Sequence, residues 1–196
     1  MLNPADPVVW TTYADRSYIA SRLLWFTSLW MDAPVQAHRT VELYLKAFLV
    51  SHAIPIERGG VWGHDLGVLY DKCIEVDRTF GNADAERRLK FLNRYFEYVR
   101  YPSDPGSPED GSLVWFSFES NILVLDELVG YVRPRIRIDP EQWVRSELTA
   151  ILHGEDKTLR HRALVDANSQ LKAIVCSRTQ STPITFSDFR SGEKGC

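Results

Sequence analysis

Arg100 and Tyr101, which stand before Pro102 and after the tyrosines at 95 and 98, form the strongest candidate binding group in the sequence. A guanidinium holds phosphate oxygens in a planar, two-pronged geometry, and phenol rings beside it can stack on bases. An arginine at a helix C-terminus also complements the helix dipole, so a purely structural role is available. The group therefore predicts either a phosphate- and base-binding surface or the end of a helix.

Two shorter patterns bring further polar side chains to helices. Glu42 and Lys46 are four residues apart, so on a helix they pair either at the surface or along a polar groove between helices. Asp65 is a good N-cap, which leaves His64 to bond a neighbouring loop or a ligand. The candidate ligand-binding residues are Arg100, Tyr101, His64, Asp65, Glu42 and Lys46.

In order and spacing, the segments 37–49, 64–66 and 100–102 resemble the signature of HEPN domains. The resemblance covers about the first two-thirds of the chain. It implies an all-α, up-and-down helical bundle that forms a homodimer and handles a nucleotide or RNA. The Arg-Tyr-Pro sequence resembles the branch associated with nucleotidyltransferases. A separate nucleotidyltransferase is therefore the expected partner protein, and a toxin–antitoxin or phage-defence system is the expected setting.

The resemblance also supplies a criterion for RNase activity, namely an arginine followed after four to six residues by a histidine on a late core helix. Such a pair would place a cation at the scissile phosphate and a proton-transfer group at the ribose hydroxyl. After Arg100 the next histidine is His153, beyond the expected bundle. Arg58 and His64 have the required spacing, but they lie in a glycine-rich stretch, away from the family's position.

We therefore predict an interaction domain associated with nucleotides or nucleic acids, with no catalytic residue. Two alternatives remain open: a metal-independent endoribonuclease that uses His64, and a structural adaptor that recruits a protein through its C-terminal helices. Phosphate-binding and dinucleotide-binding loops, His-Glu-x-x-His and the nucleophile elbow are missing, and the five histidines lack metal-ligand spacing. The sequence thus predicts no cofactor and no metal.

Composition narrows the class of protein further. A formal net charge of −3 gives no general attraction to polyanions or membranes. Three widely spaced cysteines suit a reducing compartment, and the apolar runs are too short to span a bilayer. We therefore expect a soluble, cytoplasmic protein without membrane contact.

The apolar spacing predicts helices almost throughout. Thr12 and Asp15 resemble a capping box at the first helix start, and Asp139-Pro140 is a strong start late in the chain. The expected helices cover about 12–30, 34–49, 66–80, 84–100, 113–132, 140–153 and 156–174. The expected units are a bundle over residues 8–138, a helical extension over 139–178 and a flexible tail over 179–196.

Overall fold

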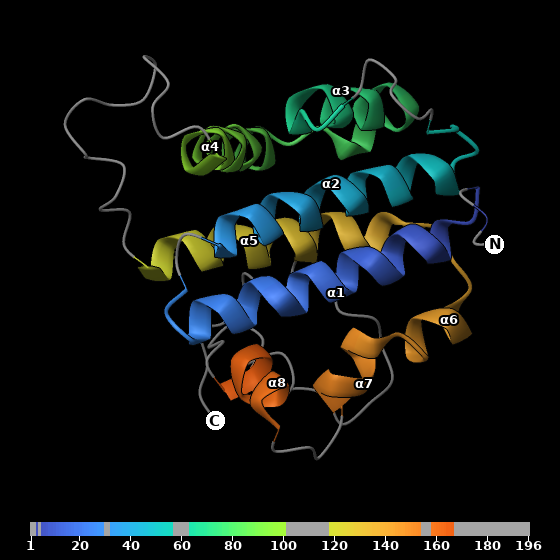
Figure 1. Ribbon diagram of the computed structural model, residues 1–196. Helices are drawn as coiled ribbons and strands as arrows, with labels where there is room; N and C mark the ends of the chain where they lie inside the picture. Colours follow the sequence, from blue (N-terminus) through green and yellow to red (C-terminus); the bar gives the residue numbers. More distant parts are fainter. Residues whose placement is uncertain are drawn as a thin grey trace, which may run out of the picture.

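The computed structural model describes residues 3, 5–29, 32–56, 63–100, 118–153 and 158–166 (Figure 1). The described part is helical and contains no strand, which confirms the all-α prediction. The α-helices are α1 (Pro7–Phe26), α2 (Ala33–Ser51), α3 (Leu66–Val76), α4 (Ala83–Arg100), α5 (Phe118–Val132), α6 (Pro140–Val144), α7 (Glu147–His153) and α8 (Leu159–His161). Short turns of other helix types are η1 (Arg78–Phe80), η3 (Arg133–Arg135) and η4 (Arg162–Asp166).

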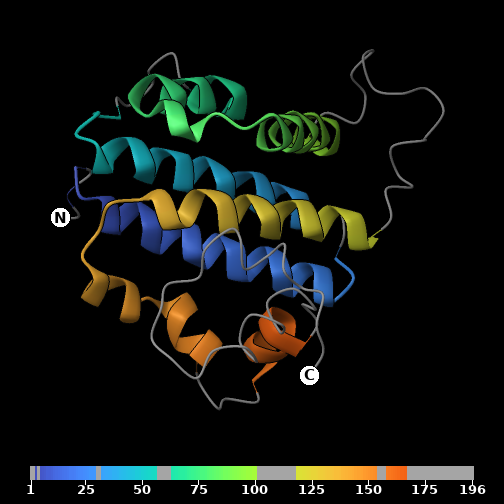
Figure 2. The ribbon, with the colours of Figure 1, turned by 180° about the vertical axis from the view of Figure 1, so that it is seen from behind.

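The helices form three layers. α1, α2 and α5 lie side by side in the middle, with α3 and α4 on one side and α6, α7 and α8 on the other (Figures 1 and 2). In both views α4 is seen nearly end-on, so it crosses the long helices instead of running along them. Within the described residues, no helix is both long and apolar enough to cross a membrane.

An aromatic cluster around Phe80 joins α3 and η1 to the middle layer. The Phe80 ring packs against Phe48 of α2 at 4.4 Å and against Tyr131 of α5 at 5.5 Å between centroids. The hydroxyls of Tyr70 and Tyr131 both donate to the Phe80 carbonyl oxygen. This buried carbonyl is therefore satisfied, and one short turn, η1, is fixed by α3 and α5 together.

The start of α1 differs from the predicted capping box. Asp6 is the N-cap, its side chain accepts a hydrogen bond from the Val8 amide, and Pro7 occupies the first turn. Proline lacks the amide hydrogen that a first turn leaves unpaired, so this start is better than the one at Thr12. Thr12 lies inside the helix, and the Asp15 carboxylate is buried against other elements.

The late helices also differ from the prediction. Asp139 caps α6 as expected, but the helix ends at Val144 and a second helix begins at Glu147. The break is stabilised at Ser146, whose hydroxyl accepts from the Thr149 amide and so caps α7. The last helix begins at residue 159, after Thr158 as its N-cap, and not at 156. The predicted portion beyond residue 166 lies outside the described residues.

Two buried carboxylates connect the middle layer to the C-terminal segment. Asp15 on α1 accepts hydrogen bonds from Tyr44 on α2 at 2.5 Å and from Arg133 at 3.0 and 3.2 Å. Arg133 also donates to Ser146 at 3.0 Å and stacks over the Trp143 ring at 4.1 Å. This first network therefore joins α1, α2 and η3 to the α6–α7 segment.

The second carboxylate is Asp126 on α5. It accepts from the Tyr18 hydroxyl at 2.6 Å and from the Arg22 guanidinium at 3.0 Å. Arg22 in turn donates to the carbonyl oxygen of Ala163 in η4 at 3.1 Å. Leu148 of α7 and Leu164 of η4 are buried in the same hydrophobic core. The described part of the extension thus shares the bundle core, while the boundaries at residues 138 and 178 stay predictions.

Candidate functional site

The predicted pair on α2 is an almost buried ion pair. The Lys46 ammonium lies 2.5 Å from one oxygen of Glu42, and the two side chains are only 11% and 9% exposed. Lys46 also donates to the Gly63 carbonyl oxygen at 3.3 Å, and it lies 5.9 Å from the centre of the Trp10 ring. The sequence left a surface pair and a polar lining between helices as alternatives. The burial excludes a freely solvated surface pair.

His64 is attached to this pair from the start of α3. Its Nδ1 lies 2.9 Å from the second oxygen of Glu42, and its side chain is 70% exposed. Because a carboxylate can only accept, this contact assigns the proton to Nδ1. Nε2 has no hydrogen-bond partner among the described residues. His64 therefore presents an oriented hydrogen-bonding atom to solvent.

The electrostatics keep Glu42 ionised. Burial acts to raise the pKa of its carboxyl, but the hydrogen bonds and charges of Lys46 and His64 outweigh burial and lower that pKa below its ordinary value. Both carboxylate oxygens are used, one by each partner. Glu42 is consequently a fixed acceptor that sets the ring orientation of His64.

Asp65 has the role in capping that its position predicts. One oxygen of its carboxylate accepts from the amides of Gly67 at 2.7 Å and Val68 at 3.3 Å, at the first turn of α3. The carboxylates of Glu42 and Asp65 stand here against one ammonium and one imidazole. Whether the imidazole is neutral or charged, the two carboxylates leave no excess positive charge for a phosphate, and this suits hydrogen-bond recognition or proton exchange at His64 Nε2.

A neighbouring polar contact was absent from the sequence prediction. One helical turn before Glu42, His38 Nε2 lies 3.0 Å from the side-chain oxygen of Asn93 on α4, and the His38 ring stacks on Phe96 at 3.9 Å. Burial lowers the pKa of His38 more than the hydrogen bond that its ring donates to Asn93 raises it, which favours a neutral ring. The sequence hints at this contact only through the spacing of His38, Glu42 and Lys46. Positions four residues apart lie on the same row of α2, so His38 lies beside the predicted pair.

The remaining candidates are placed only in part. Arg100 is the last residue of α4, as the helix-terminating alternative requires, and its side chain lies outside the described residues. It follows Asn93 by seven positions, so the backbone of α4 places both residues on one row. Tyr101 and Arg58 also lie outside the described residues. The structure thus brings Glu42, Lys46, His64 and Asp65 together and leaves their relation to Arg100 and Tyr101 a prediction.

No group of three or more potential ligands arranged for a metal ion occurs among the described residues. Neither the curated proteins nor the solved structures yield a match to this chain. The family model of the HEPN domain matches residues 8–114. That range is more than half of the chain, and it contains α1 from its second residue, α2 to α4 and every candidate residue discussed above. The chain therefore belongs to the HEPN domain family.

Proposed function

We propose that this HEPN domain is a non-catalytic interaction domain that binds a nucleotide or an RNA strand. The observation that supports the proposal is the His64 imidazole, which is exposed and oriented by the buried Glu42–Lys46 pair. A group fixed in this way loses little conformational entropy when a ligand binds, which favours recognition. We further propose that the domain works beside a separate nucleotidyltransferase in a toxin–antitoxin or defence system, as the Arg-Tyr-Pro sequence suggests.

The chemistry divides between two ends of the candidate site. The lack of excess positive charge around His64 favours a neutral ligand group there, such as a ribose hydroxyl or a base edge, which forms a hydrogen bond with Nε2. The phosphate would then be held by the Arg100 guanidinium, with Tyr101 stacked on a base. This division makes Arg100 the source of affinity and His64 the source of selectivity for the group that contacts it.

The test is an NMR titration of the isotope-labelled full chain with a nucleoside monophosphate, a nucleoside triphosphate and a short RNA. We expect resonances of His64, Arg100 and Tyr101 to move together for at least one of these ligands. His64→Ala should weaken that ligand, whereas His161→Ala, a change on α8, should leave it unchanged. If none of the three resonances moves at millimolar ligand, the binding proposal is wrong.

A second candidate function is a metal-independent endoribonuclease. The observation that favours it is again geometric: a carboxylate holding Nδ1 and an outward Nε2 is the arrangement in which an imidazole acts as a general base. Cleavage of RNA in the presence of a chelator would support this function, provided that His64→Ala abolishes it and leaves the fold intact. If the wild type leaves RNA uncut under these conditions, the non-catalytic proposal stands.

We also propose a homodimer, as in the expectation from the family resemblance. Light scattering coupled to size-exclusion chromatography gives the mass in solution directly. A single species near 22.5 kDa, the mass of one chain, would contradict the dimer.

A further inference from the structure

His38 is a buried histidine that joins α2 to α4 beside the candidate site. Its side chain is 1% exposed, and its Nε2 lies 3.0 Å from the side-chain oxygen of Asn93. Its ring stacks on Phe96 at 3.9 Å, with 17° between the ring planes. The hydrogen bond restrains the ring within its plane, and the stacking restrains it perpendicular to that plane. One side chain of α2 therefore holds two positions of α4.

The first half of α4 is fixed by contacts of its own. Asn82 accepts hydrogen bonds from two amides of the first turn, at 2.9 and 3.1 Å, and Leu89 and Leu92 are buried in the hydrophobic core. The contact with His38 comes directly after this apolar part. Helix ends fray unless other groups hold them. The order of the residues that follow Phe96 therefore depends on the contact with His38.

Position 100 lies on the stripe of α4 that faces α2. With about 3.6 residues in a turn, positions 93, 96 and 100 fall within about 60° around the helix axis. Asn93 and Phe96 contact His38 of α2, so the helix backbone carries position 100 on the same side. Arg100 is the last residue of α4, about 10 Å beyond Asn93 along the axis. Loss of the His38 contact would act directly on the place of Arg100.

The α2 end of this contact belongs to the candidate site. His38 lies one turn before Glu42, whose carboxylate holds the His64 ring at 2.9 Å. One row of α2 thus contacts the start of α3 through Glu42 and the second half of α4 through His38. Because the first of these segments carries His64 and the second carries Arg100, this row sets the separation between the two ends of the candidate site.

We propose that His38 is a positioning residue of the candidate site: it holds the last turn of α4 on α2 and thereby places Arg100 relative to His64. The proposal rests on the ligand-binding function proposed above for Arg100 and His64. His38 acts on a ligand through α4 and not by contact. A ligand that reaches both ends of the site then loses less conformational entropy on binding, because the end of α4 is already ordered.

Ionisation of His38 makes this contact sensitive to pH. Burial lowers its pKa, against the smaller opposing effect of the hydrogen bond to Asn93, and α4 meets the ring with neutral side chains. The other titratable or charged groups that act on it are Glu42 on α2 and His64 and Asp65 at the start of α3. The folded protein thus favours the neutral ring. The contact is fully effective above pH 6.5, the ordinary value, and weakens as the pH falls through the lowered pKa.

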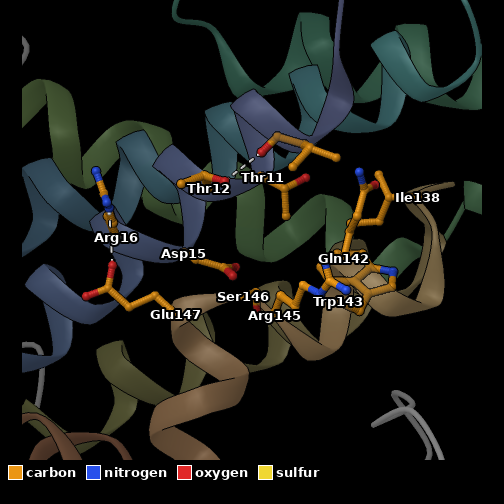
Figure 3. Close-up of a pocket in the computed structure, with 11 residues that line it drawn as sticks. Thr11, Thr12, Asp15, Arg16, Ile138, Gln142, Trp143, Arg145, Ser146 and Glu147 are labelled. Carbon is orange, nitrogen blue, oxygen red and sulfur yellow. Dashed lines mark hydrogen bonds and ion pairs between the residues drawn. The ribbon is translucent and has the colours of Figure 1, made fainter. Parts of the chain in front are cut away.

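The first experiment is amide hydrogen exchange of the labelled full chain, expressed as protection factors for residues 97–100. Asn93→Ser removes the acceptor for His38 with little change in helix propensity. We expect this variant to lower the protection about five-fold, the factor that corresponds to one ordinary hydrogen bond. Arg16→Gln is the control. It breaks another contact between layers, the pair of Arg16 with Glu147 at 3.2 Å (Figure 3), and should leave residues 97–100 unchanged.

The same measurement at two pH values separates the imidazole from general stability. In the wild type, the protection of residues 97–100 relative to α3 should fall between about pH 7.5 and about pH 5.5. His38→Gln supplies an amide that donates to Asn93 and does not titrate, and Asn93→Asp supplies a carboxylate that keeps a protonated ring. Both variants should lose the pH dependence. A fall that persists in His38→Gln would overturn the assignment to His38.

The second experiment repeats the nucleoside monophosphate titration with Asn93→Ser. We expect about five-fold weaker binding, because the ligand must then order the end of α4 itself. Unchanged protection in Asn93→Ser would overturn the proposal, and so would unchanged affinity in a variant whose protection has fallen. The exchange measurement needs no ligand. A wild type that binds no ligand would therefore contradict the proposed function, while lowered protection in Asn93→Ser would still show that His38 fixes the last turn of α4.

Discussion

Asp126→Asn should be among the most destabilising single changes in the chain. Asp126 and Arg22 form an ion pair at 3.0 Å, with side chains 1% and 2% exposed. The substitution keeps the size of the side chain but removes the negative charge, so the guanidinium stays buried without a counter-ion. Removing one partner of a buried pair costs about 3–5 kcal/mol, because the other charge is then uncompensated. The Tyr18 hydroxyl donates to the same carboxylate at 2.6 Å. The neutral oxygen of an amide is a weaker acceptor for this hydroxyl than the charged carboxylate.

Urea unfolding followed by circular dichroism measures this cost. With a slope of about 2 kcal/mol per molar urea, a loss of 3–5 kcal/mol lowers the midpoint by roughly 1.5–2.5 M. Glu86→Gln is the matched control, since it breaks the exposed pair of Glu86 with Lys90 by the same chemical change. An exposed pair contributes about 0–1 kcal/mol, so the control should move the midpoint by less than about 0.5 M. Equal shifts for both variants would refute the claim that Asp126 compensates a buried charge.

Three further predictions concern other parts of the molecule. The folded protein lowers the pKa of the Glu42 carboxyl below its ordinary value of 4.5. The ionised carboxylate therefore contributes fully to stability above pH 4.5, and this contribution is lost as the pH falls through the lowered pKa. The difference in unfolding free energy between wild type and Glu42→Gln should therefore be constant near neutral pH and shrink in acid. Asp65→Ala should cost about 1 kcal/mol through loss of the α3 N-cap, and Asp65→Ser much less, measured by the urea midpoint. Leu148→Ala should cost about 2–5 kcal/mol, because Leu148 is buried, whereas Val144→Ala on the exposed side of α6 should change stability by less than about 0.5 kcal/mol.

A different result would contradict each of these three predictions. A Glu42 difference that grows as the pH falls would mean that the protonated form is the stabilising one. If Asp65→Ser is as unstable as Asp65→Ala, the carboxylate does more than cap the helix. Equal effects of Leu148→Ala and Val144→Ala would show that α7 is not part of the bundle core.

Local features of the sequence predicted the helices and several of their starts. Asp65 and Asp139 were recognised as N-caps because capping depends on residues within one turn, and the structure confirms both. The start of α1 was missed because two capping patterns compete there. Thr12 and Asp15 have the spacing of a capping box, but the Asp6-Pro7 pair precedes Thr12 and begins the helix first.

The candidate site was predictable in its members but not in its geometry. The spacing of Glu42 and Lys46 predicts an ion pair, and the structure confirms that pair. Its burial follows from contacts with Trp10 and Gly63, which lie on other segments and leave no periodic signal near α2. The contact between His64 and Glu42 joins two residues that are 22 positions apart in the sequence. Only the fold brings such groups together.

The long-range network changes what must be regarded as the folding unit. The family match ends at residue 114, but the buried charges on α1 have their partners after it. Asp15 pairs with Arg133, and Arg22 pairs with Asp126 and donates to the Ala163 carbonyl. A fragment that stopped at residue 114 would lack these partners, and it would also lack Leu128, Leu148 and Leu164, which are buried in the same core. We therefore expect such a fragment to be much less stable than the full chain, because the charge partners and the apolar residues that cover α1 are lost together.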